Sequence, residues 1–223
     1  MNKNVKHVEF HWVEGKPEVN PADEARLDQS AGPDLRQPHG GWIQTFTGRA
    51  VFPLDPREED IDILDIAHAL SLQCRFSGHV REFYSVAEHS VRVAKLVADL
   101  DGTFLPGASD ALWALLHDAS EAYLVDVPRP IKRAVGMEAY REAERGLQRV
   151  ICRRFGLPEE EPVAVRLADQ TLLSTEARDL MPPNEEYWGQ WRADFPPLER
   201  RIEPWSSYSA KLSFLQWWER LKP

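Results

Sequence analysis

The sequence contains little cysteine and no long apolar segment. Its two cysteines, Cys74 and Cys152, are too few for a disulfide framework, and neither belongs to a Cys-x-x-Cys pattern. We expect both to pack as small apolar residues in a reducing compartment. Residues 1–16 lack the apolar core of a secretory signal, and no run approaches the ~20 apolar residues of a membrane-spanning helix. These absences predict a cytoplasmic protein with no membrane partner.

An excess of positive charge is also absent. The formal net charge is −9, whereas proteins that bind nucleic-acid polymers gain most of their affinity by neutralising phosphates with Lys and Arg. We therefore expect no nucleic-acid polymer as a partner. A small phosphorylated molecule stays compatible with the composition, because a local cluster of basic side chains in one pocket is enough to bind it.

The 223 residues are enough for one domain preceded by a tail. Residues 1–40 are polar and interrupted by several prolines, so we interpret them as an irregular lead-in with one short strand within residues 7–13. Residues 41–223 form the expected main domain. The histidines of the lead-in are interpreted as surface residues: His7, His11 and His39.

Hydrophobic periodicity in the main domain indicates helices that follow one hairpin. Two β-prone runs flank Thr47-Gly48 within residues 42–52, a pattern typical of a β-hairpin. Ser85 and Glu88 form a capping-box pattern at one helix start, and residues 184–205 are expected to form a loop. The predicted fold class is all-α, a helical bundle with a small N-terminal β-hairpin. Apolar spacing predicts helices over 61–75, 85–100, 110–123, 137–155, 161–181 and 206–221.

Four polar side chains fall on apolar faces of three predicted helices: His89, His117, Asp118 and Asp169. Taken singly, each favours a structural role, because one buried histidine is usually only hydrogen-bonded and a lone His-Asp pair is common. Taken together, they would leave two carboxylates buried without partners, which is costly. A divalent cation bound by all four removes that cost. We expect His117 and Asp118 to grip the ion from one side of their helix, where neighbouring positions differ by about 100°.

The ligand set indicates which metals the site would accept. Two imidazoles and two carboxylates form a mixed nitrogen and oxygen environment that suits Mn, Fe, Co, Ni or Zn and does not exclude Mg. Four protein ligands on a six-coordinate ion leave two positions open. One can hold water and the other a phosphate oxygen, which is an arrangement for metal-assisted hydrolysis.

Three longer segments resemble a known family. YSVAEHSVRVA, ALLHDASEAYLVDVPRPIK and ADQTLLSTEARDL are similar to the successive motifs of HD-domain 5'-deoxynucleotidases and of phage and bacterial relatives that dephosphorylate deoxynucleotides. The resemblance spans roughly residues 42–180 and implies an HD-domain helical bundle. Its pattern of one histidine, a His-Asp pair and a later aspartate falls on His89, His117-Asp118 and Asp169.

The resemblance implies catalytic and substrate roles for further residues. Glu121 matches a position that orients or activates the attacking water, Asp126 matches an aspartate beside the leaving group, and Lys132 matches a lysine next to the phosphate. Without the resemblance, Glu121 is as well explained as a solvated glutamate at a helix end. Asp126 is then a turn residue before Pro128, and Lys132 is a surface lysine. Both sets of alternatives stay open from the sequence.

The segment before His89 matches residues that contact phosphate and sugar in the family. Arg75 suits a phosphate because its planar guanidinium binds two oxygens at once, and the resemblance places Phe76 near the sugar. Some relatives have tryptophan there, so phenylalanine predicts a preference for deoxyribose and not strict selectivity. His79 and Arg81 are candidates for a phosphate or base contact and equally for anchoring a loop, whereas His68 is interpreted as a packed helix histidine.

These observations predict a metal-dependent phosphohydrolase that acts on a small nucleotide. The first choice is a 5'-nucleotidase for deoxynucleoside monophosphates. A deoxynucleoside triphosphate triphosphohydrolase uses the same ligands and stays open, as does an HD module that senses nucleotides without turnover. Such a sensor is expected to lose Glu121 or Asp126, and both are present. A dimer or larger homo-oligomer is compatible with the sequence.

Overall fold

The computed structural model describes residues 10–13, 16–19, 41–100 and 109–223. The chain divides into two compact units, Met1–Gly41 and Trp42–Pro223. In the first unit, β1 (Phe10–Val13) pairs antiparallel with β2 (Lys16–Val19). The strand expected within residues 7–13 is thus confirmed, whereas β2 was not predicted. The expectations for His7 and His39 and for the rest of the lead-in fall outside the described residues.

The second unit begins with the predicted hairpin. β3 (Ile43–Gln44) pairs antiparallel with β4 (Ala50–Val51). Gly48 provides the positive φ of 85° that the turn requires. The hairpin is tied to the next helix by the buried carboxylate of Asp65, which accepts hydrogen bonds from Thr47 N at 2.7 Å and Thr47 Oγ1 at 2.9 Å.

The rest of the described chain is mostly helical, so the coarse fold prediction of a helical protein with a small N-terminal sheet is confirmed. Among the described residues, no helix combines the length and apolar character needed to cross a membrane. Short 3-10 turns are found at η1 (Glu58–Asp60) and η2 (Arg75–Gly78). The α-helices are α2 (Ile63–Leu72), α3 (Val86–Leu100), α4 (Ser109–Leu116), α5 (Glu121–Leu124), α6 (Arg129–Lys132), α7 (Glu138–Phe155), α8 (Val163–Leu180), α9 (Glu185–Asp194) and α10 (Ser207–Leu221).

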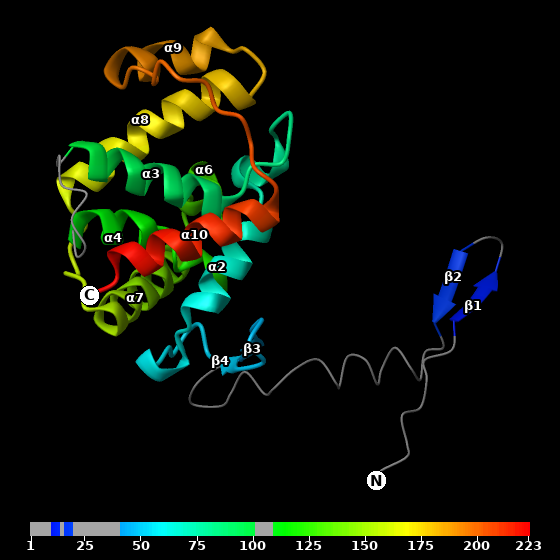
Figure 1. Cartoon of the computed structure of the whole chain (residues 1–223). Coiled ribbons are helices and arrows are strands. Elements are labelled where there is room, and N and C mark those ends of the chain that lie inside the picture. Colours follow the sequence, from blue (N-terminus) through cyan, green and yellow to red (C-terminus); the bar gives the residue numbers. More distant parts are fainter. Residues whose placement is uncertain (1–9, 14–15, 20–40, 101–108) are drawn as a thin grey trace. The chain divides into compact units, whose positions relative to one another are not determined.

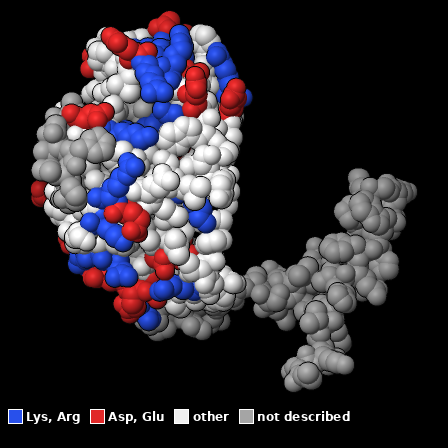
Figure 2. All heavy atoms as spheres, viewed as in Figure 1, with Lys and Arg blue, Asp and Glu red and all other residues white. Residues whose placement is uncertain are grey.

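Helix α3 lies at the centre of the second unit. It packs against α2, α4, α8 and α10, and Figure 1 shows α9 on the far side of α8 from it. Small and β-branched residues such as Ala87, Val93, Ala94 and Val97 are fully buried and let the neighbouring helices approach. Because α3 is covered on several sides, its polar residue His89 is also fully buried. On the face drawn in Figure 2, acidic and basic side chains are interspersed.

The start of α3 follows the predicted cap only in part. Glu88 N donates to Ser85 Oγ at 3.1 Å, so the serine caps the helix as expected. In a capping box, the Glu88 side chain would accept from the backbone N–H of Ser85, but it binds other partners here. Its carboxylate accepts from Arg92 at 2.7 Å and from Trp205 N at 2.8 Å, which fastens the segment before α10 to α3.

The loop expected over residues 184–205 was wrong for its first half, which forms α9. Asn184 caps this helix by accepting from Tyr187 N, and Glu185 and Glu186 occupy its first turn. A capping asparagine followed by acidic residues is a helix-start signal. The aromatic residues of this segment indicate packing onto the core, but they do not by themselves distinguish a helix from a loop.

Candidate metal centre

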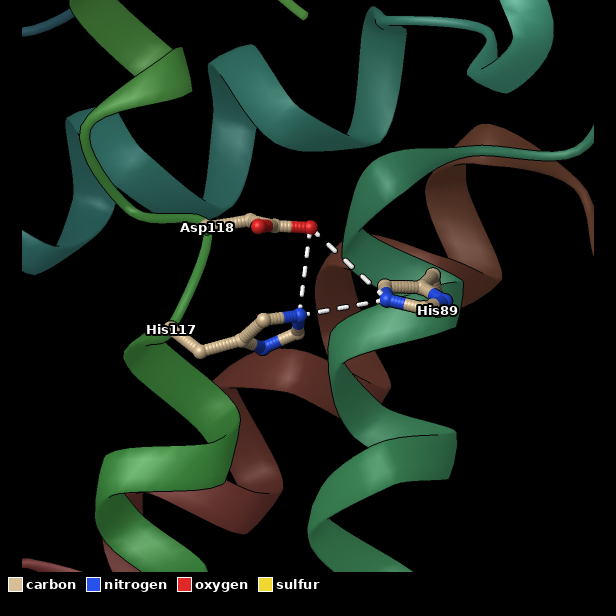
Figure 3. A group of neighbouring side chains, drawn as sticks. All are labelled: His89, His117 and Asp118. Atoms are coloured by element: carbon tan, nitrogen blue, oxygen red, sulfur yellow. Dashed lines mark hydrogen bonds and ion pairs between the residues drawn. The ribbon is translucent and has the colours of Figure 1, made fainter. Parts of the chain in front are cut away.

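Three segments far apart in the sequence bring two imidazoles and two carboxylates together. His89 comes from α3, His117 and Asp118 follow α4, and Asp169 comes from α8. The Nε2 atoms of His89 and His117 lie 3.2 Å apart. Asp118 Oδ2 lies 3.2 Å from His117 Nε2 and 3.7 Å from His89 Nε2 (Figure 3). Asp169 Oδ1 lies 3.2 Å from His89 Nε2, so the fourth predicted ligand contacts one member of this group.

Both histidines use their Nδ1 atoms to bind other groups. His117 Nδ1 donates to the carbonyl of Ala114 at 2.7 Å, so this nitrogen carries the proton. His89 Nδ1 lies 2.7 Å from Glu176 Oε1. Burial opposes the charge of Glu176, but Arg75 and His89 lower its pKa, so the carboxylate accepts this hydrogen bond. In the neutral imidazoles, two Nε2 lone pairs therefore face each other.

The two facing Nε2 lone pairs and the nearby carboxylates of Asp118 and Asp169 repel one another, so a positive charge between them is stabilising. Burial disfavours an imidazolium, yet Asp118 raises the pKa of His117 to about 9. Burial likewise opposes the charge of Asp169, but His89 lowers the pKa of that carboxyl to about 2. One ligand atom from each of His89, His117 and Asp118 lies within 4.8 Å of the others. A divalent cation would satisfy the lone pairs and the carboxylates at once, so the donor set fits such an ion.

The local backbone around the His-Asp pair differs from the sequence expectation. A continuous helix over residues 110–123 was wrong, because α4 ends one residue before His117 and a turn leads from there to α5. On a continuous helix, neighbouring side chains diverge by about 100°. The turn removes that constraint and lets His117 and Asp118 reach the same point.

Glu176 is a site residue that the sequence reasoning missed. It lies on α8 seven residues after Asp169, which is two helical turns along the same face. The side chain is fully buried and also lies 3.3 Å from Arg75 Nε. The spacing from Asp169 within the segment ADQTLLSTEARDL was the signal that could have found it.

Arg75 reaches the site but is held there by carboxylates. Its Nη1 lies 3.4 Å from Asp118 Oδ2, and its Nε faces Glu176. Burial opposes its charge, but Glu176 and Asp118 raise the pKa of the guanidinium. The backbone that delivers it is strained, because Phe76 and Ser77 have φ values of 55° and 52°. Such left-handed non-glycine residues cluster at functional sites.

Glu121 lies beside the predicted ligands at the start of α5. Its side chain is buried, with Oε1 3.7 Å from Lys132 Nζ, and Oε2 has no hydrogen-bond partner among the described residues. Burial, Asp118 and Asp126 together raise the pKa of Glu121 well above its ordinary value. Lys132 Nζ also lies 2.5 Å from Glu144 Oε1. The lysine is therefore fixed by two carboxylates and is not a plain surface residue.

Asp126 lies close to Glu121 and Lys132, at the end of a strained turn. The preceding residue, Val125, has a φ of 61° and a ψ of 158°, a conformation that β-branched residues rarely adopt. Asp126 N donates to Gln73 Oε1 at 3.1 Å, which anchors the turn to the end of α2. Burial is the main cause that raises the pKa of Asp126, with a further contribution from Asp118.

A cavity of about 520 Å³ opens beside the predicted ligands. This volume lies within the ~300–1,000 Å³ range of small-molecule pockets. Phe76 lies on its wall, next to Arg75. The charged groups that line it are Arg75, Asp118, Glu121, Asp126, Arg129, Lys132 and Asp169.

Two predicted substrate residues lie elsewhere. His79 and Arg81 line a separate hollow with Met181 and Trp188, and they do not line the cavity beside the metal ligands. Arg81 N donates to Leu180 O at 2.9 Å, so the backbone of this segment is anchored to the end of α8, and the roles of the two side chains stay predictions. His68 stacks on Phe46 with ring centroids 3.8 Å apart. It is therefore a packed helix histidine, as expected.

Comparison with known proteins places the chain among relatives of similar length. No protein-family model matches it. It is 39% identical to the uncharacterised protein YfdR of Escherichia coli strain K12 over 147 residues, which cover 66% of this chain and 76% of YfdR. It is 38% identical to the uncharacterised protein RCAP_rcc00048 of Rhodobacter capsulatus over 141 residues, which cover 61% of this chain and 69% of that protein. Because most of YfdR is matched at this identity, the chain belongs to the family that includes YfdR.

Proposed function

We propose that the protein is a metal-dependent phosphohydrolase of the HD-domain type that acts on nucleotides, with deoxynucleoside 5'-monophosphates as the first choice of substrate. The observation that carries this proposal is the cluster of His89, His117 and Asp118, with Asp169 against His89, beside a cavity that Asp118, Asp169 and Glu121 line. A divalent cation held there would supply Lewis-acid chemistry, polarising a phosphoryl group and activating water. The remaining roles belong to the side chains around the ligands.

Glu121 is placed to hold and deprotonate the attacking water. Its Oε2 atom is buried and accepts no hydrogen bond from the described residues, so it is available to a ligand in the cavity. Its raised pKa supports this role, because it makes the carboxylate a stronger base. Lys132 orients the other oxygen from 3.7 Å.

Asp126, Arg75 and Lys132 support the departure of the leaving group. The raised pKa of Asp126 favours a carboxyl that can donate a proton to the leaving oxygen. The guanidinium and the ammonium are held in fixed positions by carboxylates. Fixed charges of this kind stabilise negative charge that develops on a phosphoryl group without further reorganisation.

A nucleotide panel tests the proposal. Deoxynucleoside 5'-monophosphates, the matching triphosphates and their ribose counterparts are incubated with the full chain and Mn²⁺, Co²⁺ or Mg²⁺, and the products are separated by ion-exchange chromatography. Release of inorganic phosphate from monophosphates supports the first choice. Release of inorganic triphosphate supports the triphosphohydrolase. Binding of nucleotides without turnover under any metal would overturn the hydrolase and support a sensing module.

A further inference from the structure

Helix α9 carries aromatic side chains that the bundle buries only in part. No residue of α9 is fully buried, and Tyr187 is 73% exposed. The helix packs against α8, and Tyr187, Trp188 and Trp191 line the cavity beside the metal ligands. Large aromatic side chains are normally buried in a core or an interface. The aromatic side chains of α9 line a cavity instead.

The cavity therefore has two chemically different kinds of lining. One is charged and consists of the carboxylates beside the histidines with Arg75 and Lys132. The other is apolar, where Phe76, Leu173 and Pro130 add to the aromatic residues of α9. A phosphate alone would leave most of the 520 Å³ empty. The shape and lining fit a molecule with a phosphate at one end and a flat apolar group at the other.

Arg129 adds a cation to the aromatic end. Its guanidinium lies 5.7 Å from the ring centre of Trp191. Arg75 and Lys132 each have carboxylate partners, but within the described part of the chain no carboxylate lies within ion-pair distance of Arg129. A cationic hydrogen-bond donor is thus available beside an aromatic surface.

We propose that α9 and Arg129 form a subsite for the planar heteroaromatic base of the substrate. The rings of Trp188 and Trp191 pack against the base, and the Arg129 guanidinium donates to acceptor atoms at its edge. The inference rests on the proposed function, because that function places the phosphate at the metal end. It adds that the base, and not only the phosphate and sugar, is recognised.

The test compares two probes that cannot be hydrolysed. One is the phosphonate analogue of deoxyadenosine 5'-monophosphate, with carbon in place of the bridging oxygen. The other is the same phosphonate of 2-deoxyribose without a base. Each is titrated by calorimetry into the full chain with Mn²⁺. Since stacking of a base on an aromatic side chain is worth ~1–3 kcal/mol, the probe with the base should bind about 10- to 100-fold more tightly.

Substitutions test whether the proposed subsite causes the tighter binding of the probe that carries the base. Trp191→Ala should remove most of it and leave the Kd of the base-free probe unchanged, while Trp191→Phe keeps part of it by retaining a ring. Arg129→Gln is at an exposed position and should weaken only the probe with the base, by a few-fold. Tyr208→Ala, which removes an aromatic side chain of α10 that is 70% exposed, is the control and should change neither Kd.

Several outcomes would overturn the inference. These are equal affinities of the two probes for the unmodified protein, no binding of either probe, or a Trp191→Ala variant that weakens both probes equally. Turnover of deoxyadenosine 5'-monophosphate is measured in parallel. Base-dependent binding without turnover would sink the hydrolase and keep the subsite, whereas turnover with equal probe affinities would sink the subsite alone.

Discussion

Replacing Glu176 with glutamine should weaken metal binding although Glu176 is not a predicted ligand. The carboxylate fixes the proton of His89 on Nδ1 at 2.7 Å and faces Arg75 Nε at 3.3 Å. Glutamine has nearly the same shape but no charge. Its amide can still accept from His89 through oxygen, but it then turns an NH₂ group toward the guanidinium, where two donors meet.

The size of the effect follows from the interactions that are lost. Groups that orient a metal-binding histidine typically change metal affinity by ~10–100-fold when mutated, which corresponds to ~1.4–2.7 kcal/mol. We therefore expect the Kd for Mn²⁺ to rise about 10- to 100-fold in Glu176→Gln, because the imidazole becomes a weaker and less well-oriented donor. The variant should also unfold at a lower temperature, since Arg75 loses a buried partner.

A neighbouring carboxylate separates these two effects. Asp179 lies three residues further along α8, is almost fully buried and pairs with Arg178 at 2.7 Å and Arg201 at 3.0 Å. Asp179→Asn should lower the melting temperature but leave the calorimetric Kd for Mn²⁺ unchanged. Equal losses of metal affinity in both variants, or no loss in Glu176→Gln, would refute the positioning role of Glu176.

Three further predictions concern catalysis, substrate and pH. Glu121→Ala should abolish most nucleotide turnover while Mn²⁺ stays bound, with exposed Glu142→Ala as control; activity within a few-fold would contradict the water-holding role. Arg75→Ala should weaken binding of every nucleotide, whereas Phe76→Ala should mainly erode a preference for deoxyribose that is at most ~100-fold, as kcat/KM for matched ribo- and deoxynucleotides would show. Burial opposes the charge of Asp179, but its paired arginines lower its folded-state pKa, so its stabilisation is present above the unfolded pKa of ~3.9 and lost as pH falls. Urea unfolding should therefore show that Asp179→Asn destabilises the protein less at about pH 3 than at pH 7; equal losses at both pH values would contradict this sign.

Elements with strong local signals were predictable from the sequence. The hairpin around Thr47-Gly48 and the helix capped by Ser85 follow from residues within a few positions of one another. The left-handed end of α7 is likewise local, because Gly156 adopts a φ of 70° there. His89 and Asp169 were predicted to face the interior from the spacing of apolar neighbours, and the structure buries both side chains wholly or largely.

Features that depend on distant contacts were not predictable in the same way. The break after α4 comes where the His117 side chain turns back to the carbonyl of Ala114 at 2.7 Å, so the backbone follows the site and not the apolar period. Glu88 accepts a hydrogen bond from Trp205 N, in the segment before α10, instead of forming the expected capping-box bond. Glu176 looked like one more helix glutamate, since nothing near it in sequence reveals that His89 lies against it.

The charge of the cavity explains how an acidic protein can suit an anionic substrate. Asp118 and Glu121 line the same cavity as Arg75 and Lys132, but both cations are already paired with carboxylates. Such a surface repels a phosphate unless another positive charge is present. A divalent cation at the converging histidines would reverse the sign locally, and Arg129 adds a cation that no carboxylate among the described residues neutralises. The net charge of −9 is therefore compatible with the proposed binding of a single phosphate in this cavity.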